Sequence, residues 1–297
     1  MKSEQPGLIE PGLWCLGRRE SNVYLLEGNR DTILISGGLS YILPDVLKQM
    51  ASFGINIAKI NKFLILHAHF DHIGIIPYFK RKNPQLEVYA SVRGWEILKK
   101  EKAIATINEF SSLTTKRMGL EEGLRGYDYE WRHDVWGKTI KEGDTIDLGG
   151  RTIGILETPG HSSCSLTAYV PEIKALFPSD GGGIPFGSEI SPAGNSNYTL
   201  YQQSLKKLAD LEVKVLCADH YGYVTGDEAA DYIHRSIRSA ADYRRLVEET
   251  YREERDPEKT VDRLVQMIFS ERSDYFLPKE IITGVTGQVV KHIVNLM

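Results

Sequence analysis

Disulfide chemistry and membrane insertion both find little support in the sequence. Only three of its 297 residues are cysteines, and Cys15, Cys164 and Cys217 lie far apart along the chain. An odd and dispersed set forms neither a disulfide framework nor a Cys-x-x-Cys metal motif, so we expect three small buried side chains. No apolar run approaches the roughly 20 residues that span a bilayer. The run at residues 63–66 is typical of a short buried strand.

An excess of charge of one sign is also missing. The net charge is −4 and the isoelectric point is near 6.1, whereas nucleic-acid binders usually carry a basic face. Residues 1–11 are polar and lack the apolar stretch of a signal peptide. Hydrophobic residues make up 41% and charged residues 26%, which is ordinary for a globular protein. We therefore expect a cytoplasmic protein that binds neither nucleic acid nor membrane.

Short strands alternate with helices over much of the chain. Two β-rich runs at residues 23–26 and 32–35, joined by Gly-Asn-Arg-Asp, predict a hairpin. The spacing of apolar residues over 43–53 predicts a helix. The same reasoning predicts strands at residues 62–66, 87–90, 145–148, 152–157, 165–170, 175–178 and 213–217, and helices at 73–82 and 198–211. This alternation indicates the α/β class.

Two segments depart from the alternation. Residues 92–135 are mostly helical in pattern, and we interpret them as a helical insertion. From residue 227 onward the pattern is helical throughout, with candidate helices at 227–252, 256–270 and 278–296. The chain is therefore predicted to consist of a domain over residues 1–225 and a C-terminal helical extension over residues 226–297.

Seven candidate metal ligands follow strands or lie in glycine-containing turns. His67 and His69 stand two residues apart at a strand end, so both side chains can point to the same side. The full set is His67, His69, Asp71, His72, His161, Asp180 and His220. Imidazole and carboxylate ligands suit zinc, iron or manganese, and seven suffice for two ions.

Isolated histidines are more often core or surface residues than ligands, and His133, His234 and His292 receive no role. A group such as His67 to His72 differs, because polar residues are expensive to bury without a purpose. The residues therefore predict a site for two divalent metal ions.

In this order of motifs the chain resembles the metallo-β-lactamase superfamily over about residues 10–225. The resemblance implies an αββα sandwich with two metals at one edge of the two sheets. His67, His69 and His161 would hold the first ion. The second would be held by Asp71, His72 and His220, with Asp180 bridging the two.

The residues at two positions refine this resemblance. Asp180 stands where well-known zinc β-lactamases have cysteine. In having aspartate at this position the chain is similar to the glyoxalase II thioesterases and lactonases. Ser36 stands where many members have aspartate, which affects the geometry of that loop. Residues 63–67, 86–91 and 273–278 also resemble the thioesterase of bacterial alkylquinolone-signal biosynthesis. That match implies an acyl-thioester substrate and a pocket covered by helices.

The resemblance implies hydrolysis by a hydroxide that bridges the two metals, with Asp71 orienting it as the catalytic residue. Because no motif supplies a general acid, a thioester, ester or lactone is favoured over an amide, and a thioester or ester is expected first. The alternatives are a lactonase acting on acyl-homoserine lactones, a regulatory or interaction protein with secondary hydrolase activity, and a di-iron oxidoreductase.

Three aromatic residues near the later ligands are candidates for binding the small-molecule acyl substrate. Phe186 follows Asp180, and Tyr221 and Tyr223 follow His220. Simple packing is an equal or better explanation for each of them. The lysines at residues 99–102 could meet a coenzyme A phosphate, although a solvated helix face explains them better. The C-terminal helices could also form a homodimer surface.

Overall fold

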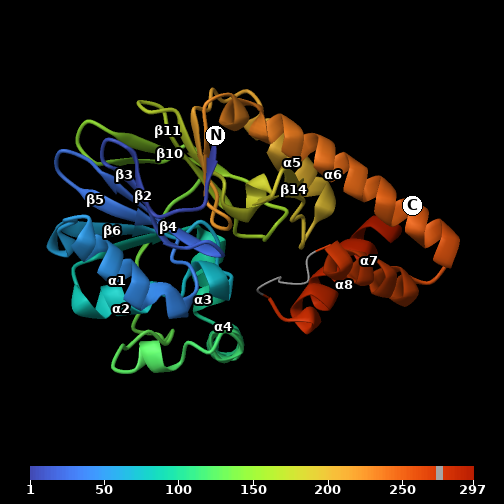
Figure 1. The fold of residues 1–297 in the computed structure, drawn as a ribbon, viewed down its shortest axis with the longest axis horizontal. Helices are drawn as coiled ribbons and strands as arrows, with labels where there is room; N and C mark the ends of the chain where they lie inside the picture. The colour runs from blue at the N-terminus through green and yellow to red at the C-terminus, as the bar shows by residue number, and fades with distance from the viewer. Residues whose placement is uncertain (272–276) are drawn as a thin grey trace.

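Two β-sheets form the centre of the computed structural model, which describes residues 1–271 and 277–297 (Figure 1). Within these residues each sheet has seven strands. The first sheet has the order β2 (Gly7–Glu10), β3 (Leu13–Arg18), β4 (Ser21–Glu27), β5 (Thr32–Ile35), β6 (Ile60–Leu64), β7 (Glu87–Ala90) and β8 (Lys138–Thr139). The second has the order β1 (Lys2–Ser3), β16 (Tyr223–Thr225), β15 (Val215–Cys217), β12 (Ala175–Phe177), β11 (Leu166–Val170), β10 (Thr152–Glu157) and β9 (Thr145–Asp147).

The direction of the strands determines where their loops meet. β4 and β5 pair antiparallel, which confirms the predicted hairpin. β5, β6, β7 and β8 run parallel to one another, as do β12 and β15 in the other sheet. Parallel neighbours require crossover connections, which the intervening helices provide. The carboxyl ends of parallel neighbours therefore lie together at one edge of each sheet.

An apolar layer between the two sheets holds them together. Ile35 and Leu64 from the first sheet and Ile155 and Phe177 from the second are buried in one cluster. Tyr24 meets Phe177 edge to face at 5.6 Å, and its hydroxyl donates to the carbonyl of Ala218 at 2.6 Å. All three cysteines are buried and unpaired, as predicted.

Helices cover the outer face of each sheet (Figure 1). The first sheet is covered by α1 (Leu43–Ser52), α2 (Ile76–Lys82), α3 (Val92–Leu98) and α4 (Glu101–Arg117), and the second by α5 (Tyr198–Leu208) and α6 (Asp227–Glu254). Buried residues recur along α6 at Ala229, Ile233, Ser236 and Ala240, the spacing of a helix with one packed face. The layers therefore follow the predicted αββα order.

Two helices extend the structure beyond the sandwich. α7 (Pro257–Glu271) and α8 (Lys279–Val294) pack against each other and against α6, and a cluster that includes Leu264, Val289 and Val290 joins them. Of the segment 273–278 that carried the narrower resemblance, residues 273–276 lie outside the described residues. No helix in the described part of the chain has the length and apolarity needed to cross a membrane.

Some predicted boundaries were wrong. α2 begins at Ile76 and not at residue 73, because the amides of Gly74 and Ile75 bind the carbonyls of Gly38 and Gly37. The insertion is helical only as far as η4 (Glu122–Leu124). Residues 125–135 are irregular and are held in place largely by hydrogen bonds and ion pairs from Arg81.

Short elements were also missed. The predicted loop after Asp180 contains a hairpin of β13 (Ile184–Phe186) and β14 (Glu189–Ser191).

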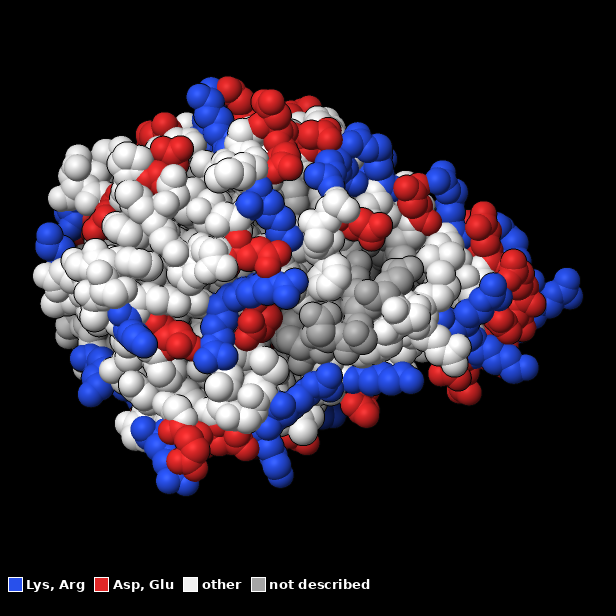
Figure 2. Space-filling model, in the orientation of Figure 1, with Lys and Arg blue, Asp and Glu red and all other residues white. Residues whose placement is uncertain are grey.

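On the face shown in Figure 2, acidic and basic side chains mix over the outer end of the C-terminal helices, and no field of one sign forms there.

Candidate metal centre

Loops at one edge of the two sheets bring the seven predicted ligands together. The loop after β6 carries His67 and His69 and leads into η3 (Phe70–His72), which holds Asp71 and His72. His161 follows β10, Asp180 lies in η5 (Ser179–Gly182) after β12, and His220 follows β15. The amide of Leu166 donates to the carbonyl of Leu66 at 2.8 Å and so ties the two sheets together beside this edge.

Three histidines form the first half of the centre. His161 Nε2 lies 3.2 Å from His67 Nε2 and 3.0 Å from His69 Nδ1. Burial lowers the pKa of His67 well below its ordinary value and lowers those of His69 and His161 to about 4. All three rings are therefore neutral at pH 7 in the metal-free protein.

Asp71, His72 and His220 form the second half. His220 Nε2 lies 3.3 Å from His72 Nε2 and 3.7 Å from Asp71 Oδ2. Asp180 reaches both halves, because its carboxylate oxygens lie 3.2 Å from His72 Nε2, 3.5 Å from His220 Nε2 and 3.5 Å from His161 Nε2. The structure therefore brings all seven residues into one cluster.

The two carboxylates give the second half a preference for positive charge. Burial alone would lower the pKa of His72, but Asp180 and Asp71 raise it well above its ordinary value. Asp180 likewise outweighs burial and raises the pKa of His220. Burial opposes the charged form of Asp180, yet the neighbouring histidines hold its pKa well below the usual range. The two carboxylates therefore favour a cation in this half.

Hydrogen bonds behind the rings fix which nitrogen faces the centre. His161 Nδ1 donates to the carbonyl of Ala193, and His220 Nδ1 donates to that of Glu20, both at 2.7 Å. Because a carbonyl can only accept, Nδ1 of each ring carries a proton, and Nε2 is the nitrogen that faces the centre.

Asp219 and Ser179 do the same for His72 and His67. His72 Nδ1 donates to Asp219 Oδ2 at 2.7 Å. Ser179 also donates to that oxygen and lies 3.1 Å from His67 Nδ1. Sequence reasoning missed Asp219, although its position directly before His220 in a turn was the available signal. Ser36 takes no such part, because its buried hydroxyl has no hydrogen-bond partner among the described residues.

Unusual backbone conformations flank the ligands. Ser179 precedes Asp180 with φ +49°, and Tyr221 follows His220 with φ +58°, a region that side chains rarely adopt. Gly160 precedes His161 with φ +133°, and a Cβ there would lie 2.2 Å from the backbone nitrogen of Tyr201. The chain therefore accepts strain and close packing in order to aim these ligands.

The donor set fits metal ions. Two groups, His67 with His69 and His161, and Asp71 with His72 and His220, each place one ligand atom per residue within 4.8 Å of the others. In the first group three ring nitrogens converge on one point, an arrangement that suits a cation bound between them. A grouping of His67, His72 and Asp219 is also close, but hydrogen bonding accounts for it.

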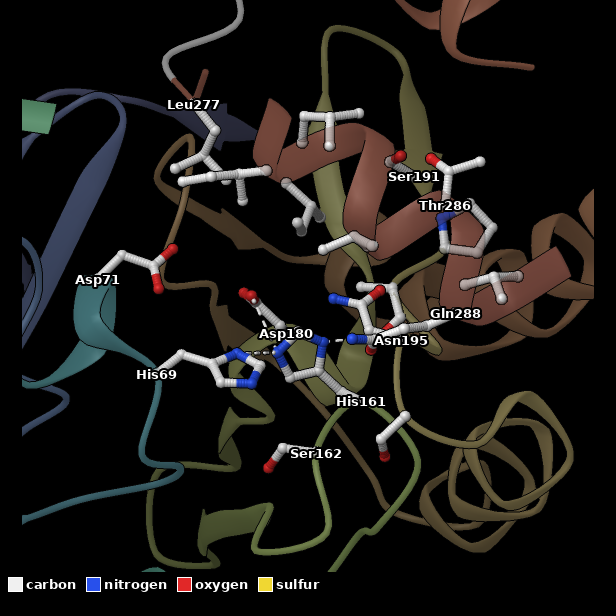
Figure 3. A pocket seen from close by; sticks show the side chains of 18 of the residues that line it. His69, Asp71, His161, Ser162, Asp180, Ser191, Asn195, Leu277, Thr286 and Gln288 are labelled. Atoms are coloured by element: carbon white, nitrogen blue, oxygen red, sulfur yellow. Dashed lines mark hydrogen bonds and ion pairs between the residues drawn. The ribbon is translucent and has the colours of Figure 1, made fainter. Parts of the chain in front are cut away.

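A cavity of about 1030 Å³ opens beside this cluster. Figure 3 shows His69, Asp71, His161 and Asp180 on one side of it, with α8 residues such as Thr286 across from them. The remaining wall comes mainly from α4, α6, α7, α8 and the β13–β14 hairpin. Helices far from the ligands in sequence thus enclose the space that the ligands face.

The predicted substrate residues lie elsewhere. Phe186 and Tyr221 meet edge to face at 5.1 Å, and Arg19 lies over the Tyr221 ring at 5.4 Å. Tyr223 packs against the apolar layer between the sheets. None of the three belongs to the described wall of the cavity, and their binding role stays a prediction.

Comparisons with known proteins agree with this geometry. The acyl-coenzyme A thioesterase MBLAC2 of Gallus gallus is 26% identical over 203 residues, which cover 64% of this chain and 67% of that protein. A metallo-beta-lactamase fold-containing protein of Sulfurisphaera tokodaii is 27% identical over 217 residues, or 69% of this chain and 74% of that protein.

The fold and the family profile point the same way. The crystal structure of a metallo-beta-lactamase family protein from Thermus thermophilus matches with a TM-score of 0.67 at 18% identity, over 96% of this chain and 94% of that one. The profile of the Metallo-beta-lactamase superfamily matches residues 16–220, a span that begins in β3 and ends at the last of the seven ligands. The predicted resemblance is confirmed, and the chain belongs to the metallo-β-lactamase superfamily.

Proposed function

We propose that the protein is a two-metal hydrolase of acyl thioesters. One ion would be held by His67, His69 and His161, and the other by Asp71, His72 and His220, with Asp180 reaching both. Divalent ions in such a site polarise a carbonyl and lower the pKa of bound water towards about 7. The observation that carries the proposal is the opening of this cluster onto a cavity large enough for an acyl group.

Asp71 is proposed as the catalytic residue. Its carboxylate is buried, lines the cavity and lies within 3.7 Å of His72 and His220. A carboxylate in this position can accept a hydrogen bond from the attacking water and hold it towards the substrate carbonyl. In Figure 3 its side chain faces Asp180 across the ligand cluster.

The leaving group favours thioesters over amides. Beside the ligands the cavity wall offers Ser162, Ser163 and Asn195, which are weak proton donors at neutral pH. A thiolate can leave without a proton because the pKa of an alkyl thiol is only about 8.5, whereas an amine needs an acid. The relative named as an acyl-coenzyme A thioesterase supports the same choice. We place the enzyme in the cytoplasm, on its three unpaired buried cysteines.

A substrate panel tests the proposal. Metal content is measured on protein purified without added metal, and turnover is measured on acyl-coenzyme A thioesters, aryl esters, acyl-homoserine lactones and a β-lactam. We expect two zinc, iron or manganese ions per chain and the highest kcat/KM on thioesters.

Two variants give this panel a control. Asp180→Asn should lower thioester turnover by about 100-fold or more, as the loss of one essential charged group does. Asp262→Asn changes an exposed carboxylate of α7 outside the described cavity wall and should leave turnover intact. Cleavage of lactones without thioesters would make the protein a lactonase, and metal-loaded protein that cleaves nothing would overturn the proposal.

A further inference from the structure

Charge is unevenly distributed over the wall of the cavity. Outside the ligand cluster, the charged residues of its described wall are Lys100, Lys102, Glu189 and Asp242, and all four are exposed. The buried part of the same described wall, which includes Ile107, Leu264, Ile282 and Val289, carries no charge. The cavity therefore has a charged mouth and an uncharged interior.

The C-terminal helices give the interior its apolar character. Apart from Thr286 and Gln288, every residue that α7 and α8 contribute to the described wall is apolar; these are Leu264, Met267, Ile268, Ile281, Ile282, Val285 and Val289. Opposite them, Phe110 of α4 meets Phe70 edge to face at 5.5 Å, and Phe70 directly precedes Asp71 in the sequence. Apolar walls thus continue up to the ligands.

We propose that this cavity holds the alkyl tail of the substrate, so that the enzyme selects long-chain acyl thioesters. The inference rests on the proposed thioesterase function and names its substrate class. The thioester carbonyl lies at the ligand cluster, the alkyl chain lies among α4, α7 and α8, and the polar leaving group extends past the exposed Lys100 and Lys102.

Size and charge both favour a long alkyl chain over short or charged acyl groups. A cavity of about 1030 Å³ lies at the upper end of the range of roughly 300–1,000 Å³ that is typical of ligand pockets. A short acyl group would leave most of the apolar wall facing water. A chain that ends in a carboxylate would bury that charge where the described wall offers no cation, which is strongly unfavourable.

A series of saturated acyl-coenzyme A thioesters from butanoyl to hexadecanoyl tests the inference. Each buried methylene should raise kcat/KM by about fourfold until the chain fills the cavity, since burial of one methylene contributes about 0.8 kcal/mol. A kcat/KM that does not change with chain length would overturn it.

Substitutions of one α8 residue test the location of the chain. Val285 is half-buried in the cavity wall, so Val285→Phe should move the preferred chain length to fewer carbons and Val285→Ala should move it to more. Lys291→Phe places the same ring on an exposed position of the same helix and should leave the preference unchanged. An unchanged preference in both Val285 variants, or an equal shift in Lys291→Phe, would contradict the location.

Binding separates this inference from the proposed function. Non-hydrolysable alkyl-coenzyme A thioethers of the same lengths are titrated into the protein as purified by calorimetry, and Kd should fall about fourfold per methylene. Chain-length-dependent binding without turnover would leave the inference standing and remove the thioesterase. Turnover with no chain-length dependence in binding or in kcat/KM would leave the thioesterase standing and remove the inference.

Discussion

Glu87 joins three parallel strands through one carboxylate. Lys62 of β6 donates to it at 2.9 Å and Tyr89 at 2.7 Å, and Lys138 of β8 donates as well. The hydrogen bond from Lys138, that from Tyr89 and the charge of Lys62 together lower the pKa of Glu87 to about 2, against an ordinary value of 4.5. The folded state therefore favours the ionised carboxylate.

Glu87→Gln should lower the free energy of unfolding by about 1 kcal/mol at pH 7, the upper end for partly exposed ion pairs. Because the folded pKa is depressed, this contribution is complete above pH 4.5 and is lost as the pH falls towards 2. Urea unfolding of both proteins from pH 7 downward should show the gap closing below pH 4.5. Glu249→Gln, on an exposed position of α6, serves as the control, and a gap that persists in acid would contradict the assignment.

Single residues were also where sequence reasoning performed best. His67 to His72 lie close together in sequence at a strand end, so their shared chemistry could be read directly. Asp219 acts only through contacts with His72 and Ser179, which come from two other loops. Such a role depends on the folded arrangement, and for that reason the sequence indicated seven candidate ligands and missed the residue behind them.

Helix α8 contains two glycines within its length. Gly284 and Gly287 lie between apolar cavity residues, and a Cβ at either position would meet no described atom within 4 Å. Glycine within a helix is less favourable than alanine by roughly 0.5–1 kcal/mol, because the unfolded chain loses more conformational freedom. Each glycine therefore lowers the stability of this helix, although the space around it would accommodate a larger side chain.

Gly284→Ala should raise the free energy of unfolding by about 0.5–1 kcal/mol, and Gly287→Ala should do the same. The measurement is urea unfolding monitored by the far-ultraviolet signal. Gly222→Ala is the opposite case, because a Cβ there would lie within 2 Å of the carbonyl of Ser3 at φ +86°, and it should destabilise the fold. Destabilisation by Gly284→Ala would show that the helix position is more crowded than described.

Long periodic elements were predicted better than short ones. The spacing of apolar residues indicated α1, α5, α6, α7 and α8 within a few residues, because each has one packed face. β1, β13, β14 and β16 have two or three residues each and were missed, since so short a run shows no period. The resemblance implied a pocket covered by helices, but its wall residues could not be named, because α4, α7 and α8 come together around the cavity only through the tertiary fold.

Removal of metal should lower the thermal stability of the whole molecule. An ion present at 100 times its Kd stabilises the folded state by about 2.7 kcal/mol, and for a chain of this size that corresponds to about 4–5 °C in Tm. Calorimetry before and after dialysis against a chelator measures the change. His161→Gln should weaken the first half of the centre and reduce the chelator's effect. An unchanged Tm after proven metal loss would indicate that the ligands do not bind ions in the folded state.

The candidate ligands come from loops of both sheets, and this determines the order in which parts of the molecule can form during biosynthesis. When residues up to the end of β8 have left the ribosome, the first sheet and four of the ligands exist, but its inner face, with Ile35 and Leu64, has no partner. β1 can form its pairing only later still, because its partner β16 is more than two hundred residues away in the sequence. A nascent chain is thus exposed to aggregation until the second sheet is made. Loading of the proposed metal centre is then expected late, and ribosome-bound chains that end before His161 should retain divalent metal poorly while associating with chaperones.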